Sequence, residues 1–296
     1  MTKSIAFSRF HPVALFFYYL ILLLFTMFTE NPVIIASALL GALLFSVFTG
    51  STRENLQDAK FFAPMFLLVS LTNPLFSHNG ATPLFFMNDN PVTLEAIAAG
   101  VSIAATVTAV MLSFKGFSRV MESDKLLALF GKVSPKLAVV LSMALRFMPL
   151  FARKWRELCD VQKAMGYFRK ESRFSRLSSY ARVFSALVSW ALENAADTAA
   201  SMCSRGFELE SKKSFSLFRF TRADGALIAV CSVLSLPVLA GFALGRADFA
   251  FYPYISEASA DALSLIMYAS FAILSLIPFI FELTEAIKWK YFRSKI

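Results

Sequence analysis

The chain has 296 residues, of which 57% are apolar and 17% charged, with 33 phenylalanines and a formal net charge of +9. This composition excludes an ordinary water-soluble enzyme, because a soluble chain of this length rarely carries so much apolar surface, and it predicts an all-α, polytopic membrane protein. Isolated cysteines and histidines predict neither a disulfide framework nor a metal site; they are Cys159, Cys203, Cys231, His11 and His78.

Six apolar runs predict transmembrane helices at residues 13–28, 32–48, 61–77, 93–114, 225–244 and 263–281. The first two runs have about 17 residues each, the lower limit for a bilayer, and only residues 29–31 separate them, which predicts a tight helical hairpin. An Ala-Ser-Ala sequence at 36–38 is similar to a signal-peptide cleavage site. Because it lies inside the second run, we expect no cleavage.

The distribution of cations predicts the orientation in the membrane. Lys and Arg precede the first run and follow the second, fourth and sixth runs, whereas Arg246 is the one cation in the connections at 29–31, 78–91 and 245–262. Since cationic loops stay on the cytoplasmic side, we expect both termini in the cytoplasm.

The predicted spans contain few ionisable residues, and their polar residues are mainly Ser, Thr and Asn. This argues against a self-sufficient ion-coupled carrier, which usually has intramembrane charges. Residues 131–134, Gly-Lys-Val-Ser, lack the upstream glycine of a phosphate-binding loop, and the motifs G-x-S-x-G and H-E-x-x-H are absent from the sequence. We therefore expect no catalytic residue, no metal ligand and no cofactor bound by this chain.

Basic residues gather in one segment, since residues 115–222 hold 20 of the 29 Lys and Arg. Hydrocarbon cannot hold so many unpaired cations, so this segment must face water or headgroups and meet something acidic. Residues 115–136 predict an amphipathic helix on the membrane surface, followed by a turn with Gly131 and Pro135. A long helix is expected from Leu137, with a kink at Pro149 and its end at Gly166.

A second long helix is expected after a polar connector at residues 170–182 that is rich in Ser and Arg. This helix starts at about Tyr180 and stops at Gly206. A ladder of small residues allows another helix to approach closely, so the two long helices can cross each other; the ladder is Ala195, Ala196, Ala199 and Ala200.

Two acidic residues of the second helix, Glu193 and Asp197, stand at i and i+4, where like charges repel unless cations pair with them. The natural candidates on the first helix are Arg146, Arg153 and Arg156. A solvated acidic face is the alternative, and the sequence leaves both open.

Three short motifs occur in order along this segment. The first is the lead-in formed by Leu145, Arg146, Phe147, Pro149, Leu150 and Phe151; the second is the helix ending formed by Gln162, Ala164 and Gly166; the third is the ending Ser204, Arg205, Gly206 and Phe207. Together they resemble the transmembrane T component of energy-coupling factor transporters, the EcfT or CbiQ type, which serves vitamin and metal uptake. That family has L-R-F-x-P-x-[LF] before a long cytoplasmic helix ending A-Q-x-A-R-G, and a second long helix ending A-x-x-A-R-G-[FY]. Ser204 replaces the usual alanine.

The resemblance implies that the two long helices cross in an X and dock in grooves on two cytoplasmic ABC ATPases, which bind the ATP. Arg205 inherits the role of a motif arginine that meets an acidic group there. Met165 stands where the first motif has arginine, so that contact is missing or displaced to Lys163 or Arg169. Either the partner has lost its acid, or Met165 docks by apolar packing. Residues expected to support the coupling helices are Arg146, Pro149, Arg153, Glu193 and Asp197.

The function implied by the resemblance is that of a non-catalytic coupling subunit of an importer in a bacterial or archaeal cell membrane. Its partners would be the ATPases, a small substrate-binding membrane subunit that selects the cargo, and lipid, with no nucleic acid. The expected regions are a membrane region at 1–114 with about four helices, a coupling region at 115–222, and a membrane region at 223–296 with about two helices. The alternatives are a self-contained channel or carrier, and a scaffold whose basic segment binds anionic lipid.

Overall fold

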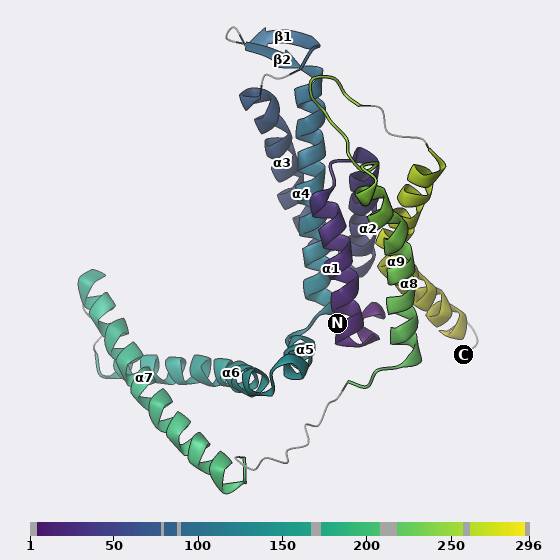
Figure 1. Cartoon of the computed structure of the whole chain (residues 1–296). Helices are drawn as coiled ribbons and strands as arrows, with labels where there is room; N and C mark the ends of the chain where they lie inside the picture. The colour runs from purple at the N-terminus through teal and green to yellow at the C-terminus, as the bar shows by residue number, and fades with distance from the viewer. Residues whose placement is uncertain are drawn as a thin grey trace. The chain divides into compact units, whose positions relative to one another are not determined.

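The computed structural model describes residues 5–77, 80–87, 90–166, 173–207, 218–256 and 261–293. These residues are almost entirely helical, with one two-stranded hairpin (Figure 1). The chain divides into two compact units, one formed by Met1–Lys125 with Phe218–Ile296 and the other by Leu126–Leu217. The predicted all-α, polytopic fold is confirmed, and each unit is described below by itself.

The first unit begins with a 3-10 turn, η1 (Phe7–Arg9), and the helices α1 (Pro12–Phe28) and α2 (Pro32–Thr49). Each of these helices starts with a proline, and the side chain of the residue before it accepts a hydrogen bond from the second helical amide. His11 accepts from Val13 in α1, and Asn31 accepts from Val33 in α2. A proline suits this position because the first helical N–H has no partner within the helix. The predicted hairpin at 29–31 is confirmed.

Helices α3 (Thr52–Phe76) and α4 (Leu94–Val120) pack against each other, and two ion pairs join them. Lys115 pairs with Asp58, and Arg119 pairs with Glu54 at 3.0 Å. Helix α3 starts nine residues before the expected position 61, because a capping box between Ser51 and Glu54 initiates it among polar residues.

A short hairpin, which the sequence analysis did not predict, connects α3 to α4. Its strands β1 (Pro83–Met87) and β2 (Asn90–Thr93) are antiparallel, and Phe85 pairs with Val92. Thr82 donates its hydroxyl proton to the buried carboxylate of Glu95 at 2.8 Å, which fixes the hairpin to the first turn of α4. Strands of four and five residues give too weak a periodic pattern to be recognised in sequence.

Helices α8 (Arg222–Ala243) and α9 (Ala262–Arg293) complete the first unit, and α9 also packs on α2. A side chain at Gly41 of α2 would meet the carbonyl oxygen of Ser275 at 2.6 Å, so these two helices approach at backbone distance. Helix α9 continues twelve residues beyond the expected end at 281. Charged residues after this position end the apolar run, but they do not end a helix.

Five of the described helices are long and apolar enough to cross a membrane, namely α2, α3, α4, α8 and α9. Helix α1 is apolar but has 17 residues, which corresponds to about 25 Å at 1.5 Å per residue, against roughly 30 Å of hydrocarbon. The six predicted runs all form helices, and five of them satisfy the length for a span.

The second unit contains α6 (Pro135–Ala164) and α7 (Arg173–Ser204), and α5 (Ser123–Val133) leads into it. The amphipathic stretch expected at 115–136 is divided, because α4 continues to Val120 and α5 follows it. Pro149 lies inside α6 without ending it. The expected connector is wrong for residues 173–182, which are already helical, since neither Ser nor Arg stops a helix; residues 170–172 lie outside the described residues.

Candidate coupling surface

Helices α6 and α7 cross each other (Figure 1). Aromatic side chains form the contact between them. The ring of Phe151 lies edge-on to Trp190 with centroids 6.0 Å apart, and Trp155 stacks on Tyr180 at 6.4 Å. Next to them Val183 of α7 is fully buried. Such pairs of large rings exclude water and contribute beyond their buried area, so the crossing is a defined contact.

The small residues predicted to allow the crossing do not take part in it. The ladder Ala195, Ala196, Ala199 and Ala200 is exposed along the last third of α7. That expectation was wrong because bulky rings, rather than close backbone approach, hold the pair together. The signal that could have found this contact is the pair of large aromatic residues Phe151 and Trp155, one turn apart in the charged part of α6, together with Trp190 in α7.

The arginines of α6 lie on one face. Arg146, Pro149 and Arg153 stand at i, i+3 and i+7, and all three are exposed. Trp155, which contacts α7, is nine positions from Arg146 and therefore projects from the opposite side of the helix. These arginines consequently point away from α7.

Of the two alternatives left open for Glu193 and Asp197, pairing with these arginines is not observed among the described residues. Both acidic residues are exposed on α7, and no ion pair joins either of them to Arg146, Arg153 or Arg156, all of which belong to the described chain. The other expectation, a solvated acidic face, fits what is observed.

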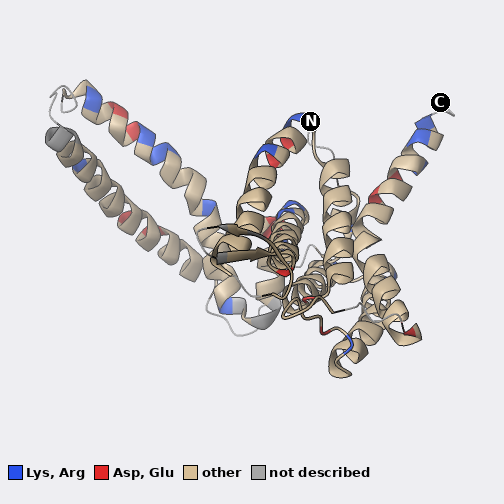
Figure 2. Cartoon of the chain, turned by 90° about the horizontal axis from the view of Figure 1, so that it is seen from above, with Lys and Arg blue, Asp and Glu red and all other residues tan. Residues whose placement is uncertain are grey.

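Other charges of α6 are neutralised along the helix itself. Lys154 pairs with Glu157 at 3.0 Å, and Lys163 pairs with Asp160 at 3.1 Å. Lys154 also lies 5.6 Å from the centre of the Trp190 ring. Figure 2 shows that basic residues mark α6 more densely than α7. Arg146 and Arg153, by contrast, have no ion pair with a described residue.

The two long helices end with the same backbone geometry. Gly166 has φ +79° and Gly206 has φ +76°, the left-handed conformation that terminates a helix, so both predicted ends are confirmed. The amide of Met165 donates to the Val161 carbonyl at 3.0 Å, and that of Phe207 to the Met202 carbonyl at 3.1 Å. Ala164 and Ser204 are the last helical residues.

The residue just before each left-handed glycine is therefore equivalent in the two ends. It is Met165 in one and Arg205 in the other, and both side chains are exposed, Met165 to 65%. Arg205 has no ion pair with a described residue. The ends thus present an apolar thioether and a free guanidinium at corresponding positions.

The side chain of Gln162, in the first helix ending, points to a different side of α6 from that of Met165. It follows Cys159 by three residues and Trp155 by seven, so it lies on the face of α6 that packs against α7. Its amide oxygen is enclosed and has no donor among the described residues. Gln162 therefore belongs to the inner side of the helix pair, whereas Met165 belongs to the outer surface.

An apolar stripe covers the first half of α6 and is not covered by the rest of the described chain. It continues the face of Phe151 and Trp155 towards the start of the helix, beyond the crossing with α7. Its exposed members are Leu137, Val140, Leu141 and Met148.

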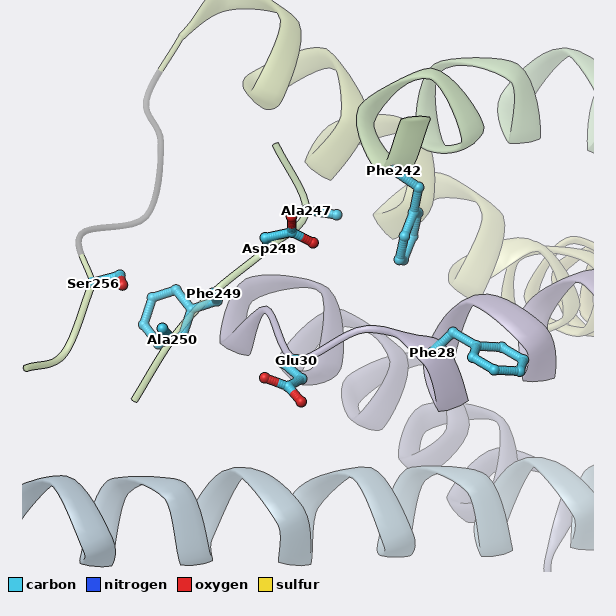
Figure 3. A pocket seen from close by; sticks show the side chains of 8 residues that line it. All are labelled: Phe28, Glu30, Phe242, Ala247, Asp248, Phe249, Ala250 and Ser256. Atoms are coloured by element: carbon cyan, nitrogen blue, oxygen red, sulfur yellow. The ribbon is translucent and has the colours of Figure 1, made fainter. Parts of the chain in front are cut away.

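A separate cavity of about 550 Å³ lies within the first unit, between the connections that follow α1 and α8. Phe28, Phe242 and Phe249 contribute to its walls, together with the carboxylates of Glu30 and Asp248 (Figure 3). In Figure 3 these carboxylates do not point toward one another, unlike ligands that share one cation. Among the described residues no group of three or more His, Cys, Asp or Glu could hold a metal ion.

Comparison with known proteins identifies the family of this chain. No curated protein matches the chain. The sequence model of one family, CbiQ, described as cobalt transport protein, matches residues 8–215, which run from η1 through α1–α7 and include both helix endings. Families of this kind supply the membrane component of a transporter and are generally not enzymes. With more than half of its length matched and five membrane-length helices, the chain belongs to the CbiQ family of cobalt transport proteins.

Proposed function

We propose that this chain is the membrane coupling subunit of an ATP-driven importer of the energy-coupling factor type. The observation that carries the proposal is the pair of crossed helices α6 and α7, each ending at a left-handed glycine with an exposed side chain just before it. Arg205 has no ion pair with a described residue, and the side chain of Met165 is exposed, so both side chains are available to a partner. Membership of a family of cobalt transport proteins supports a role for these ends in a transporter.

The partners of these ends are two cytoplasmic ABC ATPases, which bind and hydrolyse the ATP; this chain binds none. Arg205 meets an acidic group of one ATPase, in a charge-assisted hydrogen bond that contributes about 1.5 to 3 kcal/mol once water is excluded. The free arginine face of α6, Arg146 and Arg153, adds long-range attraction to the same acidic surface.

The first ending docks without a motif arginine. Lys163, one candidate to replace it, already pairs with Asp160, and Arg169 lies outside the described residues. Met165 is exposed and flexible, and a thioether adapts to an irregular apolar groove. We therefore assign the first contact to apolar packing of Met165 on the second ATPase.

The membrane side of the mechanism uses the apolar stripe of α6. A stripe that includes Leu137 and Val140 is costly in water, and a small substrate-binding membrane subunit or lipid would cover it. ATP-driven closure of the ATPases moves α6 and α7, and the stripe passes the movement to that subunit, which selects a metal ion or vitamin. Both termini of this chain lie in the cytoplasm.

Replacement of Arg205 by Glu tests the proposal. In cells that express the chain together with the two ABC ATPases of the proposed complex, Arg205→Glu should lower the recovery of ATPase on the purified chain about tenfold or more, because one contact becomes a repulsion. The chain should still insert into the membrane. Arg293→Glu is the matched control, since it makes the same charge change at an exposed position at the end of α9. Equal recovery from both variants would refute the docking role.

A further inference from the structure

The seven residues that precede α1, Ile5–His11, make polar contacts with three other elements of the first unit. The amide of Phe7 donates to the carboxylate of Glu282 in α9 at 3.0 Å, and the amide of His11 donates to Asp224 in α8 at 2.6 Å. The ammonium of Lys125, near the start of α5, donates to the carbonyl and hydroxyl oxygens of Ser8. It also donates to the Val120 carbonyl, at the end of α4, at 2.8 Å.

These contacts stand at both points where the chain passes between the two compact units. Lys125 is the last residue of the first unit before the chain enters the second, and Phe218 is the first residue after it returns. Shortly after the return, the ring of Phe220 lies edge-on to His11 at 5.5 Å, and Asp224 caps α8 through Thr221 at 2.6 Å. One short segment therefore touches the departing and the returning chain.

The three charged side chains are nearly inaccessible to water. Asp224 is 2% exposed, Glu282 5% and Lys125 6%. Burial lowers the pKa of the Lys125 ammonium, because enclosing its charge costs free energy. The nearby carboxylate of Glu122 partly offsets this decrease in pKa. A buried charge is tolerated only where hydrogen bonds replace its water, and the backbone of Ile5–His11 supplies a large part of them here.

An apolar anchor completes the contact. Phe7 is fully buried, and its ring meets those of Phe10, Tyr18 and Phe281 at 5.6, 5.6 and 6.1 Å. Apolar packing alone would hold the segment but allow small shifts, because it has no direction. Hydrogen bonds that join side chains of α5, α8 and α9 to Phe7, Ser8 and His11 fix the position of each element relative to the others.

We infer that Ile5–His11 is a clasp that fixes both junctions of the coupling helices to α8 and α9, with Lys125, Asp224 and Glu282 as its positioning residues. This inference rests on the proposed function. With the clasp in place, movement of the second unit is passed to the membrane helices, whereas without it the junctions absorb the movement.

The test uses the complete complex in lipid nanodiscs, with and without ATP and vanadate to trap the closed ATPases. The readout is the trapping-dependent change in hydrogen exchange at residues 246–256, which follow the end of α8 opposite to Asp224, so it depends on no particular substrate. Lys125→Met removes the ammonium while keeping the length of the side chain. Glu282→Met, in another element, removes a different contact and keeps the test valid if the first variant is unstable.

The inference predicts that both variants assemble with the ATPases and hydrolyse ATP at about the wild-type rate. The trapping-dependent change in hydrogen exchange should be smaller by about fivefold or more, because a typical coupling between two sites corresponds to a factor of at least about five. Lys125→Arg, which keeps the donors, should restore the change. Lys288→Met, which removes an exposed lysine of α9, is the control and should behave as wild type.

Two results would overturn the clasp. One is a full exchange change in both variants, and the other is loss of assembled ATPase together with the change, which indicates a purely structural segment. Failure of the proposed function gives a different pattern, because the wild-type chain would then recover no ATPase at all, and the clasp would fall with it.

Discussion

At the scale of single residues, the glycine that ends each coupling helix decides where the preceding side chain points. Gly166 and Gly206 turn the chain out of the helix within one residue, because positive φ is accessible to them at little cost. Met165 and Arg205 are thereby held at the helix tip, exposed on its outer surface. The chemistry presented to a partner is set by one side chain, and its position by the glycine that follows.

The conformation of Gly166 leads to a prediction. No atom of the described residues lies within 4 Å of a Cβ added there, so Gly166→Ala adds backbone strain of about 1 kcal/mol without a collision with them. The amides of Met165 and Gly166, which donate to Val161 and Lys163, should then exchange about fivefold faster. Gly166→Asn is the control, since asparagine tolerates positive φ and should exchange more slowly than the alanine variant. Equal rates in the two variants would contradict a role for φ.

At the scale of elements, the crossing of α6 and α7 depends on a few rings. Trp190 contacts both Phe151 and Lys154. Trp190→Ala should therefore weaken the helix pair by about 2 kcal/mol or more, less than in a closed core because the ring is only half buried. Amides around the buried Val183 should exchange roughly 30-fold faster. Leu192→Ala, at a side chain 69% exposed on the same helix, should have little effect.

The elements themselves were largely predictable, whereas their contacts were not. Apolar runs and terminal glycines are local signals, so the spans and the ends at Gly166 and Gly206 followed from the sequence. The start of α7 at Arg173 was missed because composition rich in Ser and Arg suits both a connector and an exposed helix. The crossing was assigned to alanines because which residues meet between helices depends on their relative rotation, which no local pattern encodes.

At the scale of the whole molecule, charge divides the chain. Among the described residues, the five helices that are long and apolar enough to span a membrane all belong to the first unit. The second unit, residues 126–217, carries 15 of the 29 Lys and Arg. The charges that the sequence analysis passed over, Asp224 and Glu282, lie just outside the predicted apolar runs. Their role emerged only from contacts with residues more than 200 positions away, Asp224 with His11 and Glu282 with Phe7.

The natural cysteines allow the orientation to be measured. Cys203, near the end of α7, is exposed, while Cys159 and Cys231 are buried. If the second unit lies in the cytoplasm, a membrane-impermeant maleimide should label Cys203 in inside-out vesicles and leave it unlabelled in intact cells. Glu30→Cys, in the connection between α1 and α2, should show the opposite pattern. This labelling is measured in vesicles without ATPase; because Cys203 is two residues from Arg205, adding the ATPases should reduce it. Labelling in intact cells would refute the orientation and the docking role.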